Sequence, residues 1–129
     1  MSISDKEFTI FSKTINDDHV VEVKIRSFSD LADGWHFGEG GSIPEEVIGV
    51  ALALSRYARE LKFSEIDAFP GVNGEILLTI YHRNNVLELT IEPDLSINAV
   101  MEVDDMEVSD KEGLSVVEAK EQINRLKEK

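Results

Sequence analysis

The sequence contains no cysteine, which excludes disulfide bonds, thiolate metal sites and cysteine nucleophiles. It also lacks a long apolar run, because the longest one, residues 47–54, covers about eight positions where a membrane-spanning helix needs roughly twenty. Residues 1–8 are polar and acidic, whereas a signal peptide has a basic start followed by an apolar stretch. We therefore expect a soluble, cytoplasmic protein without a secretion signal.

Positive charge is scarce. The chain has 13 Lys and Arg against 26 Asp and Glu, a formal net charge of −13. Such a charge keeps a small protein soluble and repels nucleic acids and anionic membranes. The composition thus argues against direct nucleic-acid binding, and it favours a basic protein as the partner if the chain has one.

The remaining composition is that of one folded domain. The chain has 129 residues, of which 42% are hydrophobic and 30% charged, enough apolar surface for a single core. No internal repeat, low-complexity segment or long linker divides it. We treat residues 1–129 as a single domain.

The most distinctive stretch is a glycine-rich loop at residues 33–42, which holds the only Trp and four of the eight Gly. A long helix is expected directly after it. Ser42 and Glu45 have the spacing of a capping box, and Pro44 falls in the first turn, where proline is tolerated. Apolar residues then recur with helical period as far as Leu61.

The loop could be interpreted as a chemical site, because His36 lies between Asp33 and Glu39 and because glycines before a helix resemble an anion cradle. However, no second histidine stands at ligand spacing and no P-loop lysine follows. The nearby carboxylates would also repel a phosphate. We therefore expect no enzyme activity, no catalytic residue, no cofactor and no bound metal.

Period-two patterns predict strands on both sides of this helix. Residues 7–12 and 19–26 alternate around a turn at residues 16–18, which predicts an N-terminal hairpin. After the helix, residues 75–82, 86–92 and 95–103 alternate between short turns, which predicts a three-stranded meander.

The C-terminal part is expected to contain an acidic loop at about residues 102–112 and an amphipathic helix at about residues 115–127. Ser115 and Glu118 again have capping-box spacing. Short turns require antiparallel pairing, so the predicted fold is α+β. We expect an antiparallel sheet of about five strands, made of the N-terminal hairpin and the meander, with one long central helix and the C-terminal helix packed against it.

Four segments follow one another in a distinctive order: Gly34-Trp35-His36-Phe37-Gly38-Glu39-Gly40-Gly41, Ile43-Pro44-Glu45-Glu46-Val47-Ile48, Asn73-Gly74-Glu75-Ile76 and Leu87-Glu88-Leu89-Thr90-Ile91. This order, over roughly residues 31–103, resembles a group of small uncharacterised bacterial proteins. Their pattern is a Trp-Asp-Gly-x-Gly-Ala loop, then Pro-Ile and a helix, then an Asp-Gly turn that opens a short meander. His36 stands where that pattern has Asp, and Phe37 where it has Gly. The resemblance therefore implies the arrangement of loop, helix and meander, and it says nothing about activity.

Taken together, these observations favour a small acidic bacterial or phage protein that acts by binding a basic protein, as an immunity protein, an antitoxin or an inhibitor does. Aromatic anchors and acidic side chains suit such a contact. The residues expected at it are Trp35, Phe37, Glu39, Tyr57, Asp104, Asp105 and Glu107. Two alternatives stay open: a metal- or nucleotide-dependent enzyme centred on the glycine-rich loop, and a structural subunit of a larger assembly.

Overall fold

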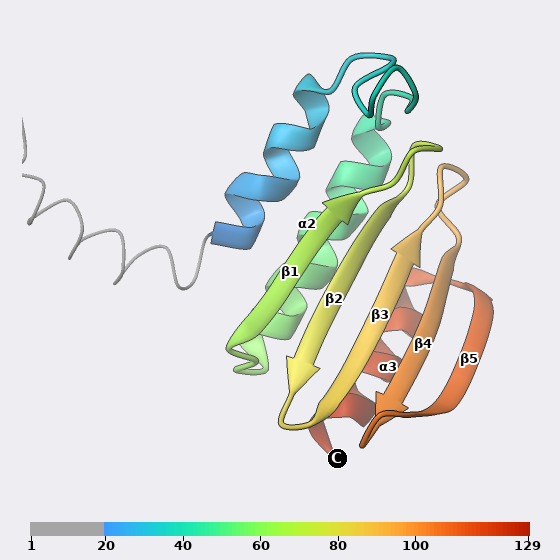
Figure 1. Cartoon of the computed structure of the whole chain (residues 1–129). Helices are drawn as coiled ribbons and strands as arrows, with labels where there is room; N and C mark the ends of the chain where they lie inside the picture. Colours follow the sequence, from blue (N-terminus) through green and yellow to red (C-terminus); the bar gives the residue numbers. More distant parts are fainter. Residues whose placement is uncertain (1–19) are drawn as a thin grey trace, which may run out of the picture.

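The computed structural model describes residues 20–129, and within them the fold is α+β, as predicted. Five antiparallel strands form one sheet in the order β1-β2-β3-β4-β5, so each strand pairs only with its neighbours in sequence (Figure 1). The strands are β1 (Glu65–Pro70), β2 (Ile76–His82), β3 (Asn85–Ile91), β4 (Ile97–Val103) and β5 (Met106–Leu114).

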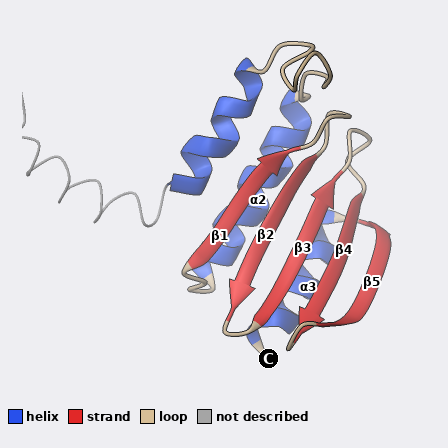
Figure 2. Ribbon diagram, viewed as in Figure 1, coloured by secondary structure: helices blue, strands red, loops and turns tan. Residues whose placement is uncertain are grey.

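Helices cover one face of this sheet. The long helix α2 (Glu45–Glu60) packs mainly on β2, and the C-terminal helix α3 (Val116–Lys127) packs on β3 and β4. Figure 2 shows both helices behind the strands, which leaves the opposite face toward the viewer. We call that opposite face the outer face.

The core lies between the sheet and the helices, because every second strand residue points inward. The fully buried positions on the central strands are Ile76, Leu78, Ile80, Leu87, Leu89, Ile91 and Ile97. From the helices, Val47, Leu54, Ile123 and Leu126 complete the core. Among the described residues, no helix is long and apolar enough to cross a membrane.

The predicted N-terminal hairpin is wrong in its second strand. Residues 20–27 are helical and continue into a 3₁₀ turn, η1 (Phe28–Asp30), while the first predicted strand lies outside the described residues. Val21, Ile25 and Phe28 are buried, a spacing of four and three residues that defines one helical face. The alternation of Val21, Val23 and Ile25 is therefore incidental, since Val23 is 63% exposed.

Ion pairs hold this first helix against α2. Glu22 is buried, and its Oε1 lies 3.0 Å from Nε of Arg56 and 2.9 Å from a terminal nitrogen of Arg59. Burial alone would raise the pKa of Glu22, but the hydrogen bond from Arg56 and the two guanidinium charges outweigh it, so the pKa lies below the ordinary value.

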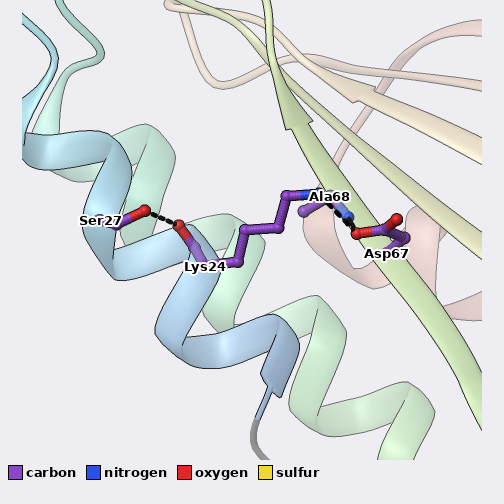
Figure 3. A network of polar contacts seen from close by, with 4 residues as sticks. All are labelled: Lys24, Ser27, Asp67 and Ala68. Carbon is purple, nitrogen blue, oxygen red and sulfur yellow. Dashed lines mark hydrogen bonds and ion pairs between the residues drawn. The ribbon is translucent and has the colours of Figure 1, made fainter.

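A second contact joins the first helix to the edge of the sheet, as Figure 3 shows. Lys24 Nζ lies 2.9 Å from Asp67 Oδ1 on β1, and it also lies 4.2 Å from the centroid of the Phe69 ring. Ser27 donates its hydroxyl hydrogen to the carbonyl oxygen of Lys24 at 2.6 Å. The first helix therefore lies beside β1, and contacts both this edge strand and α2.

Two strands of the sheet, β1 and β5, were not predicted from the sequence pattern. The connection after α2 contains β1, and most of the predicted acidic loop is β5, which pairs with β4 from Leu114 to Met106. The five strands are thus one continuous meander and not a hairpin joined to a shorter meander. Strand pairing uses backbone groups, so an acidic sequence can still form an edge strand, where its side chains reach water.

The two predicted capping boxes have different outcomes. At Ser115 both hydrogen bonds form: the Glu118 amide donates to the Ser115 hydroxyl at 3.2 Å, and the Ser115 amide donates to Glu118 Oε1 at 3.0 Å. At Ser42 the capping box is absent, because Pro44 is the N-cap of α2 and makes no side-chain cap. The amide of Ser42 instead donates to Asp33 Oδ1 at 3.2 Å.

Candidate functional site

The outer face carries carboxylates from four of the five strands. The strand registers align two rows across the whole sheet, and each row begins on β1 and ends on β5 with an acidic residue. One row is Glu65, Tyr81, Val86, Glu102 and Glu107, and the other is Asp67, Thr79, Glu88, Val100 and Asp110. The only Lys or Arg within the five strands is Lys111, opposite the inward-facing Ala99.

Within the part of the chain that the structure describes, one of these carboxylates has an ion pair: Asp67 on β1 is paired with Lys24. Within residues 20–129, no Lys or Arg forms an ion pair with Glu88, Glu102, Glu107 or Asp110. We call these four exposed residues on β3, β4 and β5 the acidic sheet surface.

Two members of this surface lie opposite each other on adjacent strands. Glu102 on β4 and Glu107 on β5 are cross-strand partners, and both are exposed. Directly opposed side chains lie about 5 Å apart at Cβ, where like charges destabilise a sheet. The register therefore places two like charges at one exposed cross-strand position. A cationic group that binds there would remove the repulsion.

The glycine-rich loop forms a small, rigid hairpin at one end of the sheet. His36 and Glu39 exchange two backbone hydrogen bonds of 2.7 and 2.8 Å. Phe37 and Gly38 form the turn between them, with φ values of +52° and +88°, as a type I′ turn requires. The turn carries Phe37 into solvent, where it is 95% exposed.

Trp35 packs against the base of this hairpin. Its indole Nε1 donates to the carbonyl oxygen of Gly41 at 2.9 Å, and the ring lies so close to Gly40 that a Cβ there would be 2.7 Å from Nε1. The amide of Gly41 donates to the carbonyl of Val72 at 2.9 Å, which ties the loop to the β1–β2 connection. Trp35 is thus half-buried and part of the loop's own packing.

Most of the loop's backbone amides donate hydrogen bonds within the protein. The amides of Gly34, His36, Gly38, Glu39, Gly41 and Ser42 all donate to oxygens within the protein. A phosphate cradle needs such amides free to point at the anion, so this geometry does not favour a nucleotide site. Among the described residues, no three His, Asp or Glu side chains are grouped as a metal site would need.

The residues expected at a partner contact lie in separate places. Tyr57 joins the two helices: its hydroxyl donates to Asn124 Oδ1 at 2.7 Å, and Lys120 Nζ lies 5.1 Å from its ring centroid. Asp104 and Asp105 form the β4–β5 turn, at the opposite end of the sheet from the glycine-rich loop (Figure 1). Trp35, Phe37 and Glu39 share that loop, and only Glu107 belongs to the acidic sheet surface.

Sequence reasoning missed the other three members of this surface, Glu88, Glu102 and Asp110. Glu88 and Glu102 are the outward positions of correctly predicted strands, so their alternation contained the signal. Asp110 carried no such signal, because β5 was expected to be a loop.

Comparison with known proteins identifies no relative of this chain. No family model, no curated protein and no solved structure matches this chain. The resemblance to small bacterial proteins with a Trp-Asp-Gly-type loop therefore stays a prediction, and the functional argument rests on the geometry.

Proposed function

We propose that this chain is a small acidic binding protein whose acidic sheet surface contacts a basic protein. The observation that carries the proposal is the absence of neutralising cations: four exposed carboxylates come from three adjacent strands, and no Lys or Arg pairs with them within residues 20–129. Complementary charge of this kind speeds association and selects against acidic competitors.

The opposed pair Glu102 and Glu107 supports the same proposal. Its repulsion is a cost to the free protein, and a Lys or Arg of the partner placed between the two carboxylates converts that cost into attraction. An immunity protein, an antitoxin or an inhibitor of a basic enzyme acts in this way, since occupation of a basic functional surface is enough to block it.

The test is a capture experiment with matched variants. The purified chain is immobilised and exposed to a lysate of its native host, and bound proteins are identified by mass spectrometry. The triple variant Glu88→Gln, Glu102→Gln and Glu107→Gln removes three charges from the acidic sheet surface. The control, Glu60→Gln, Glu121→Gln and Glu128→Gln, removes three exposed charges from the helices and their C-terminal end.

We expect the wild type and the control to retain the same basic protein at about 50 mM salt and to release it at about 300 mM, because the contact is screened. The surface variant is expected to retain little at either concentration. Retention of no basic protein, or equal retention by both triple variants, would refute the proposal.

A further inference from the structure

Phe37 is the most exposed large apolar side chain of the described residues, at 95%, and it stands in a costly backbone conformation. Its φ of +52° lies in the left-handed region, which glycine adopts freely and a bulky residue rarely does. Single exposed apolar residues are common on protein surfaces. An exposed phenylalanine at a turn position that favours glycine is uncommon, because neither the packing of the fold nor the contact of the ring with water stabilises the protein.

The hairpin holds Phe37 away from the rest of the protein. The two hydrogen bonds between His36 and Glu39 fix the turn, and Trp35 fixes its base. The ring contact recorded for Phe37 is an edge contact with the neighbouring His36, at 4.9 Å between centroids. A backbone that is already fixed loses little further freedom when the residue it carries is buried by a partner, which favours binding.

The connections at the end of the sheet that carries Phe37 are acidic. The glycine-rich loop, the β1–β2 connection and the β3–β4 connection meet at this end of the sheet (Figure 1). Their closeness is evident at Gly74, where an added Cβ would lie 3.3 Å from the carbonyl oxygen of Ser42 and 3.4 Å from Pro93 Cγ. Residues 31–55, 71–75 and 92–96 contain no Lys or Arg. They contribute seven carboxylates: Asp33, Glu39, Glu45, Glu46, Glu75, Glu92 and Asp94.

We propose that Phe37 is an anchor that inserts into an apolar pocket with a basic rim on the partner protein. This inference rests on the proposed function, which supplies a basic protein as the partner. A second copy of this chain is not the occupant, since each copy carries a net charge of −13 and these three segments contribute seven carboxylates and no Lys or Arg. Phe37 adds an apolar contact at a second place, beyond the acidic sheet surface.

The test separates binding from folding by the choice of variants. Phe37→Gly suits the φ of the turn and keeps the hairpin, so it should unfold at the same urea concentration as the wild type or a higher one. Phe37→Ala removes the ring and retains a Cβ. Val72→Ala is the control, because Val72 is a 40%-exposed apolar residue in the β1–β2 connection at the same end of the sheet.

The probe is a yeast-displayed library of protein fragments from the native host's genome. Fragments that bind the wild-type chain are purified, and their affinities are measured for each variant. We expect Phe37→Gly and Phe37→Ala to weaken binding by about thirty-fold or more, as loss of a hot-spot residue does, and Val72→Ala to weaken it by less than about three-fold.

Two outcomes would overturn the inference in distinguishable ways. Fragments that lose affinity for the Glu88, Glu102 and Glu107 triple variant, but bind Phe37→Gly as tightly as the wild type, would refute the anchor and leave the proposed function standing. Recovery of no basic fragment would refute both proposals.

Discussion

Replacement of Glu107 by Lys should stabilise the free protein, although Glu107 belongs to the proposed binding surface. Glu107 stands opposite Glu102 in the β4–β5 register, and both are exposed. In the wild type the two carboxylates repel each other across the strands. With Lys at position 107 the same two positions form a cross-strand pair of opposite charge, which stabilises a sheet.

The size of the effect follows from the geometry. Two charges about 6 Å apart in a nearly aqueous environment interact by roughly 0.7 kcal/mol, within the range of about 0.2–1 kcal/mol found for cross-strand pairs. Glu107→Gln removes the repulsion and should raise the free energy of unfolding by about 0.5 kcal/mol. Glu107→Lys also adds an attraction, so it should raise that free energy by about 1 kcal/mol.

The assay is urea unfolding at low salt and again at about 1 M salt, where a Debye length of about 3 Å screens the pair. The control Glu112→Lys lies on the same strand and changes the net charge equally, but Glu112 has no registered partner on β4. The double variant Glu102→Lys with Glu107→Lys restores a like-charge pair and should return close to wild-type stability. An equal gain from Glu112→Lys, or a gain that persists at 1 M salt, would show that the cross-strand pair does not cause the effect.

Three further predictions concern the loop, the end of β2 and the last helix. Gly40→Ala places a Cβ 2.7 Å from Trp35 Nε1 at a residue whose φ is +96°. It should lower the free energy of unfolding in urea by about 1–3 kcal/mol and change the fluorescence of the only Trp. An unchanged fluorescence spectrum would contradict the packing of Trp35 on Gly40. Burial and the charges of Arg83 and Lys127 lower the pKa of His82 below its ordinary value of 6.5. The unfolded chain therefore binds more protons there, and stability should fall as the pH drops below about 6.5; His82→Gln should flatten this part of the pH profile. Ser115→Ala removes the cap of α3 and should cost about 1 kcal/mol by urea unfolding, while Ser64→Ala, at an exposed position before β1, should cost little.

The sequence predicted the α+β class, both long helices and the three central strands, because each shows a single clear period over its whole length. The first helix was mistaken for a strand, because Val21, Val23 and Ile25 alternate while Val21, Ile25 and Phe28 also share a helical face. Which pattern prevails depends on tertiary contacts, namely the burial of Val21, Ile25 and Phe28 and the ion pairs from Glu22 to Arg56 and Arg59. No local propensity contains that information.

The candidate site was harder to predict. Phe37 and Trp35 lie in the same distinctive loop and were both expected at a partner contact. The structure shows Phe37 exposed, so its role there stays a prediction, whereas Trp35 packs within the loop. The acidic sheet surface depends on strand register, which brings Glu102 and Glu107 opposite each other across a turn. A segment rich in Asp and Glu resembles a loop in composition, so β5 and its place at the sheet edge could be recognised only from the backbone pairing.

The position of α3 after all five strands in the chain has a consequence for synthesis on the ribosome. All five strands precede α3, so the meander leaves the ribosome before Ile123 and Leu126 arrive to cover β3 and β4. Until then the inward side chains of these strands, Leu87, Leu89 and Ile97 among them, face water. During that interval the nascent chain depends on its many carboxylates for solubility, because mutual repulsion keeps neighbouring nascent chains apart.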